Sequence, residues 1–146
     1  MTLEEVIEER QGAKFLARQW VEFELYDCVT FAASVYTALR VIERPELPNY
    51  QIYSQGTSML DLTCEMIEKT EGFNLVRDSA KHGDLVVLSR GLRGHHVGIY
   101  LKGRNIAHCI RGRRRRGVEI DSFVPPISDH IHCIYRPKIW DSKNQK

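Results

Sequence analysis

The feature that most constrains the fold is a change of residue pattern at Gly83. Beyond it come short runs rich in β-branched and aromatic residues, separated by segments that contain glycine or proline. These runs cover residues 85–89, 96–101, 104–110, 117–120 and 130–136. Each has the length and composition of a β-strand. Consecutive short strands joined by tight turns favour an antiparallel sheet in the second half of the chain.

The first half has helical patterns instead. Thr2 can cap a short helix over residues 2–9, and further helices are predicted over residues 12–22 and 28–41. A fourth begins after Thr57 or Ser58 and ends at Gly72, because its apolar residues recur at helical spacing. Helices followed by strands in one short chain predict an α+β fold, with N-terminal helices packed on a C-terminal antiparallel sheet.

The 146 residues, 42% of them hydrophobic, suffice for one domain with a real core. We expect this domain to cover residues 1–140, followed by a flexible tail at 141–146. The formal net charge of +2 depends on the arginine run between Arg111 and Arg116. Gly112 and Gly117 bracket most of this run, which has no interleaved aromatic residues. A solvated loop or contact with an acidic partner is therefore favoured over nucleic-acid binding.

The N-terminal residues MTLEEVIEERQGAKF lack the apolar core of a signal peptide, and no apolar stretch approaches the length of a membrane span. We therefore expect synthesis in the cytoplasm. Four cysteines occur without a CxxC pair, at Cys28, Cys64, Cys109 and Cys133. Reduced thiols are predicted rather than a disulfide framework, and the last three are interpreted as core residues.

Cys28 stands at the start of the most clearly predicted helix, in the segment ELYDCVTFAASVY. Backbone N–H groups and the helix dipole stabilise a thiolate at this position. A buried cysteine is more often a core residue, so a nucleophile also needs a base within reach and a third group to orient that base. His96 and His108 lie on consecutive predicted strands around a turn at Lys102–Gly103, which can bring their rings together.

DCVTFAASVY, GDLVVLS, HHVGIYL and NIAHC, in this order, resemble the NlpC/P60 family of papain-like cysteine peptidases. The resemblance implies a papain-like fold with Cys28 as nucleophile, His96 as base and His108 as the residue that orients His96. A shift of one residue would exchange His96 for His95, which would lie on the other face of the strand. The resemblance implies cleavage of amide bonds in bacterial cell-wall peptides, with peptidoglycan as substrate and with no metal or cofactor.

This chain departs from the family where Val29 and Thr30 follow the cysteine, in place of the frequent Ser-Gly. It also lacks the usual glycine-rich stretch upstream, so Trp20 or Tyr26 would have to supply the aromatic wall of the substrate pocket. Asp27 is either a helix cap or a group that binds the amine of the substrate. Small phage-encoded relatives suggest a place in a virion tail and action at the host cell wall, an expectation based on analogy alone.

Three other functions stay open. One is a structural or adaptor subunit of a phage tail tip that has kept the fold and lost activity. A second is an amidase or acyltransferase that acts on another amide. The third is a zinc site formed by Cys28, His96, His108 and either His132 or Cys133, which is disfavoured because no two of these residues have the spacing of a usual ligand pair.

Overall fold

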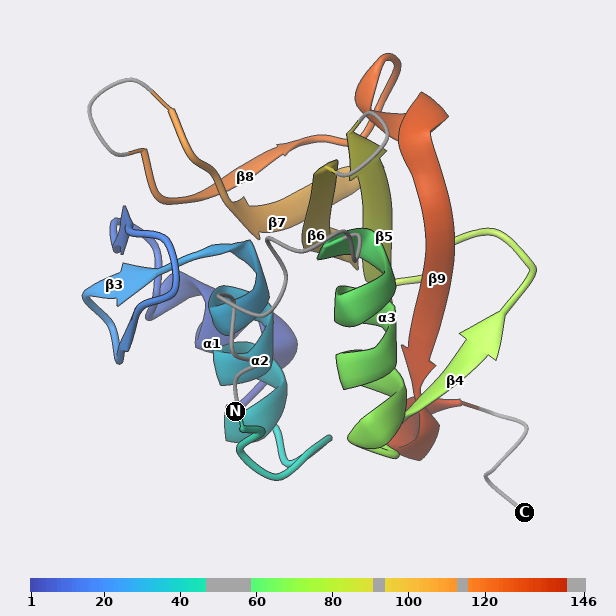
Figure 1. Ribbon diagram of the computed structural model, residues 1–146, viewed down its shortest axis with the longest axis horizontal. Helices are drawn as coiled ribbons and strands as arrows, with labels where there is room; N and C mark the ends of the chain where they lie inside the picture. The colour runs from blue at the N-terminus through green and yellow to red at the C-terminus, as the bar shows by residue number, and fades with distance from the viewer. Residues whose placement is uncertain (47–58, 91–93, 113–115, 142–146) are drawn as a thin grey trace.

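The fold was analysed in a computed structural model, which describes residues 1–46, 59–90, 94–112 and 116–141. It is α+β, as the sequence predicts (Figure 1). The helices are α1 (Leu3–Glu8), α2 (Cys28–Ala38) and α3 (Met59–Lys69). The strands are β1 (Lys14–Phe15), β2 (Trp20–Val21), β3 (Leu25–Tyr26), β4 (Phe73–Val76), β5 (Leu85–Arg90), β6 (Gly94–Leu101), β7 (Asn105–Cys109), β8 (Val118–Ser122) and β9 (Ile131–Pro137).

A six-stranded sheet forms the centre of the molecule, with strand order β4-β9-β5-β6-β7-β8 and antiparallel pairing throughout. Helices α2 and α3 lie against one face of it (Figure 1). The main core fills the space between them and includes Phe31 and Val35 of α2 and Val97 and Ile99 of β6. A smaller cluster lies on the other face of the sheet, around Val86, Leu88 and Ile106. The site described below is built between α2 and β6.

The starts of α1 and α2 are capped as expected. The hydroxyl of Thr2 accepts a hydrogen bond from the backbone N–H of Glu5, and Asp27 plays the same role for Thr30 at the start of α2. Both caps are reciprocal, because the side chains of Glu5 and Thr30 accept from the backbone N–H of the cap residue. Such caps satisfy backbone donors that the helix itself leaves without a partner. The predicted caps of α3, Thr57 and Ser58, lie outside the described residues.

The helix predicted over residues 12–22 is wrong. Gly12 has φ +90°, and Arg18 also has a positive φ, so the backbone turns instead of continuing a helix. Strands β1 and β2 both pair with β3, in the order β1-β3-β2. Pairing of β1 and β2 with β3, at Leu25–Tyr26, decides the conformation instead.

Two further features differ from expectation at the other end of the chain. Strand β4, which the sequence pattern did not predict, pairs with β9. Asp141 was assigned to the flexible tail, yet it is buried and accepts a hydrogen bond from Asn74, so the ordered domain extends at least to this residue. Within the described residues, no helix is long and apolar enough to cross a membrane.

Candidate active site

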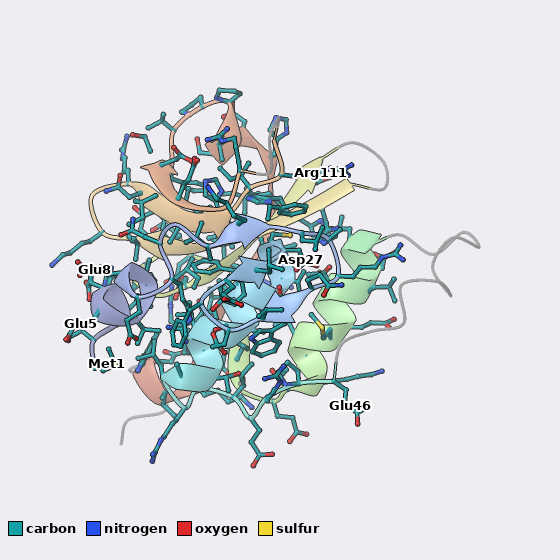
Figure 2. The ribbon with its side chains drawn as sticks, turned by 90° about the vertical axis from the view of Figure 1, so that its left-hand side faces the viewer. Met1, Glu5, Glu8, Asp27, Glu46 and Arg111 are labelled. Atoms are coloured by element: carbon teal, nitrogen blue, oxygen red, sulfur yellow. The ribbon has the colours of Figure 1, made fainter. Side chains whose placement is uncertain are left out.

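Cys28 is the first residue of α2 and has 9% of its surface exposed. It packs within the main core near the sheet. Figure 2 shows Asp27, the preceding residue, at the N-terminal end of this helix. The N–H groups of a first helical turn have no carbonyl partner within the helix and point towards negative charge. The position therefore suits both a thiolate and an oxyanion formed next to it.

Asp27 fixes the approach to this turn. One carboxylate oxygen accepts from the N–H of Thr30 at 2.8 Å and the other from the N–H of Arg18 at 3.0 Å. The side chain is buried. The helix-cap interpretation is therefore supported by two internal hydrogen bonds, whereas binding of a substrate amine stays a prediction.

His96 and His108 meet at the open end of the β6–β7 hairpin, away from its turn. The turn at Lys102–Gly103 forms as expected, with φ +82° at Gly103, and the last residue pair between β6 and β7 is Ile99 with Ala107. His96 and His108 lie past this pair. Their rings contact each other, with Nε2 of His96 2.8 Å from Nδ1 of His108, and both side chains are buried.

A third residue, Asp121 of β8, completes a chain of contacts that we call the histidine relay (His96, His108 and Asp121). Its carboxylate lies 2.7 Å from Nε2 of His108. A carboxylate only accepts hydrogen bonds, so Nε2 of His108 carries the proton, and Nδ1 of a neutral His108 is then an acceptor. Nε2 of His96 must donate to it. The relay thus assigns the basic lone pair of His96 to Nδ1.

His95 also reaches the site. Its Nε2 lies 4.0 Å from the sulfur of Cys28, and alternation along β6 places it on the same face as Val97 and Ile99, which α2 covers. Burial lowers the pKa of His95, and the negative charge of Asp27 opposes this effect. The neutral ring is therefore favoured. Of the two consecutive histidines, His95 is the one near the sulfur, whereas His96 pairs with Leu88 on the other face of the sheet and belongs to the relay.

The two aromatic candidates for the pocket wall, Tyr26 and Trp20, differ in their exposure to solvent. Tyr26 is fully buried, and its hydroxyl is bonded to the side chain of Glu22 at 2.5 Å, so its assignment to the substrate pocket is corrected to a core role. Trp20 is partly exposed, pairs with Tyr26 across β2 and β3, and has the guanidinium of Arg44 3.9 Å above its ring. Of the two, Trp20 remains the candidate for substrate contact.

The other cysteines have different environments. Burial raises the pKa of Cys109 to about 12, as for a core thiol. The sulfurs of Cys64 and Cys133 lie 3.8 Å apart, and their hydrogen bond lowers the pKa of Cys64 to about 6. The zinc site considered around Cys28 is not formed. In the part of the chain that is described, the only three-residue group with metal-ligand spacing consists of Cys64, His132 and Cys133.

Sequence reasoning missed Asp121. The alternation in VEIDS over residues 118–122 gave a signal, since Glu119 and Asp121 fall on one face of the strand. In the sheet, Glu119 pairs with His108 and Asp121 pairs with Ile106. Only the register between β7 and β8 shows that Asp121, diagonal to His108, meets its ring.

The site thus combines a thiol at a helix start, a histidine near its sulfur and the histidine relay in one antiparallel sheet, which are the residue types of a cysteine–histidine hydrolase. The family model for NlpC/P60 matches residues 17–134. The chain belongs to the NlpC/P60 family. No curated protein sequence matches it.

Solved structures show the same fold. NlpC1 from Trichomonas vaginalis superposes with a TM-score of 0.62 at 14% identity, over 92% of this chain and 43% of that one. An NLP/P60 family protein similar to a lipoprotein, from Staphylococcus aureus, gives 0.61 at 15% identity, over 92% and 40% of the two chains. The chain thus spans about two fifths of these proteins. The NlpC/p60 domain of the peptidoglycan hydrolase SagA superposes with a TM-score of 0.55 at 18% identity. The match covers 93% of this chain and 99% of that domain.

Proposed function

We propose that this protein is a cysteine peptidase or amidase that cleaves amide bonds in the peptides of bacterial peptidoglycan. The observation that carries the proposal is a cysteine at a helix start with a histidine nitrogen 4.0 Å from its sulfur, and the histidine relay in the same sheet supports it. Family membership and the fold shared with a domain from a peptidoglycan hydrolase support the substrate class. A role in a phage tail, a location in a virion, a purely structural function and action on a different amide all stay predictions.

In the proposed reaction, Nδ1 of His96 accepts the thiol proton of Cys28, which requires the His96 ring to reach the sulfur that His95 contacts in the structure, and the sulfur attacks the carbonyl carbon of the amide. The N–H groups of the first turn of α2 stabilise the oxyanion. Protonated His96 then gives its proton to the leaving amine, which departs and leaves a thioester on Cys28. A water molecule, deprotonated by His96, attacks this thioester; the carboxylic acid product leaves, and the released sulfur of Cys28 takes the proton back from His96. His108 and Asp121 hold the His96 ring and stabilise its positive charge.

The test uses purified peptidoglycan. Wild-type protein should release peptides with newly formed amine and carboxyl ends, identified by mass spectrometry, and Cys28→Ala should release none while keeping its circular dichroism spectrum. Equal release by the variant would contradict the proposal.

A second measurement tests the nucleophile without a substrate. The rate of Cys28 alkylation by iodoacetamide is followed against pH by peptide mass spectrometry. A free thiol titrates near about 8.5, and the site should shift this midpoint downward. A low pH midpoint of alkylation without cleavage of peptidoglycan would support an activated thiol. It would contradict only the proposed substrate.

A further inference from the structure

A cluster separate from the histidine relay lies where α3 crosses the sheet. Cys64 belongs to α3, whereas His132 and Cys133 belong to β9. One ligand atom from each of the three lies within 4.8 Å of the other two. Figure 1 shows α3 alongside β5 and β9. Because β5 lies between β9 and β6, this cluster and the relay are on different strands.

From this geometry we infer that Cys64, His132 and Cys133 form a binding site for a thiophilic divalent metal ion such as Zn²⁺. Thiolate sulfur and imidazole nitrogen are the ligands that zinc prefers in proteins. Water would complete a tetrahedral shell. The proposal concerns metal binding that links α3 to the sheet and does not depend on the peptidase activity.

The separation of the two sulfurs supports a metal site. Two sulfurs at about 2.3 Å from one tetrahedral zinc ion are about 3.8 Å apart. The sulfurs of Cys64 and Cys133 are separated by 3.8 Å. The pair is therefore already spaced as two ligands of one ion.

The local backbone of β9 explains how two consecutive residues face the same ion. Val87 of β5 pairs with Cys133, but the next residue, Leu88, pairs with Ile131. His132 is thus the extra residue of a β-bulge. Side chains of neighbouring residues normally point to opposite faces of a strand, and a bulge redirects one of them. Without the bulge, His132 and Cys133 would point away from each other.

The surroundings also suit a bound cation. Cys64 and Cys133 are half-buried against the core, and His132 is exposed, so an ion could enter from solvent on the histidine side.

The experiment titrates Co²⁺, a spectroscopic substitute for Zn²⁺, into reduced, metal-free Cys28→Ser protein, so that the thiol at the active site does not contribute. We expect one equivalent to bind with a thiolate-to-cobalt absorption band and to be displaced by Zn²⁺. His132→Gln should weaken binding at least tenfold, whereas His130→Gln, the matched control at a nearby exposed histidine, should leave it unchanged. Cys64→Ser and Cys133→Ser should each weaken the band.

Absence of a thiolate band, or a band indifferent to both His132→Gln and Cys64→Ser, would overturn the proposal. A second contrary result would have two parts: the reduced protein does not bind Zn²⁺, and peptide mapping finds a disulfide between Cys64 and Cys133. That result would replace the metal site with a redox pair. His132 is exposed, so we expect His132→Gln to fold, and circular dichroism checks this. Loss of metal binding by the folded variant can then be assigned to the missing ligand.

Discussion

At the residue scale, the central question is which of two consecutive histidines takes the proton of Cys28. His95 lies against the sulfur, and His96 is oriented by His108 and Asp121. Catalysis requires a base whose proton position is fixed, because the wrong tautomer presents an N–H instead of a lone pair. This requirement favours His96, whereas the contact with the sulfur favours His95.

We therefore predict that His96→Gln lowers kcat/KM by about 10³-fold or more, as expected for loss of a general base. His95→Gln should lower it by about tenfold or less. The measurement is peptide release under matched conditions, with the iodoacetamide midpoint as a second readout. The reverse order of effects would assign the base to His95.

Asp121 provides a second test at this scale. Asp121→Asn keeps the shape of the side chain but can present an N–H to His108, which would reverse both imidazole tautomers. We predict a loss of kcat of about 10- to 100-fold with little change in KM, and partial recovery in Asp121→Glu. Equal losses in Asn and Glu variants, with a lowered thermal midpoint in both, would indicate a structural role only.

At the element scale, the start of α2, where Cys28 lies, is capped by Asp27. Both oxygens of this carboxylate accept backbone N–H groups, one from the helix and one from Arg18. The cap therefore joins α2 to the segment between β1 and β2. The position of Cys28 depends on this junction.

Asp27→Ala should lower the free energy of unfolding by about 1–2 kcal/mol, because the helix loses its N-cap. Asp27→Asn, which can still accept a hydrogen bond, should cost less. Urea unfolding of the two variants and the wild type gives the comparison. If Asp27 also binds the substrate amine, Asp27→Asn will raise KM beyond what its stability loss explains.

At the scale of the whole molecule, an ion-pair network joins the C-terminal strand to the segment before β5. The guanidinium of Arg136 donates to both oxygens of buried Asp84, at 3.1 and 2.9 Å, and to exposed Asp78. This network adds side-chain contacts to the backbone pairing of β9 with β5, which are distant in sequence. It fixes the sheet on which His96 and Cys133 both depend.

Arg136→Met should destabilise the protein by about 3–5 kcal/mol, because it leaves Asp84 charged, buried and without its ion-pair partner. Asp78→Asn, which removes only the exposed partner, should cost much less, because exposed ion pairs contribute little to stability. Chemical denaturation of each variant measures the difference. Similar small effects would mean that Asp84 is adequately stabilised by the backbone N–H of Lys81, which also donates to it.

The same network predicts a dependence of stability on pH. The hydrogen bond from Arg136 lowers the pKa of Asp78 below its ordinary value of 3.8. A carboxylate whose pKa is lower in the folded state stabilises the fold above the unfolded value and loses this effect as the pH falls. Stability should therefore fall below about pH 4, and this fall should be smaller in Asp78→Asn, as measured by thermal unfolding.

The sequence by itself determined the α+β class, the capped helices α1 and α2, the later strands of the sheet and the candidacy of Cys28, His96 and His108. These features follow from local periodicity, caps and turns, and from an ordered set of motifs. Tertiary structure alone decided that residues 14–15 and 20–21 form strands, that Tyr26 is buried, and that Asp121 meets His108. It also brought Cys64 to Cys133 and His132. The physical reason is that strand register and bulges depend on partners far along the chain, which no local pattern specifies.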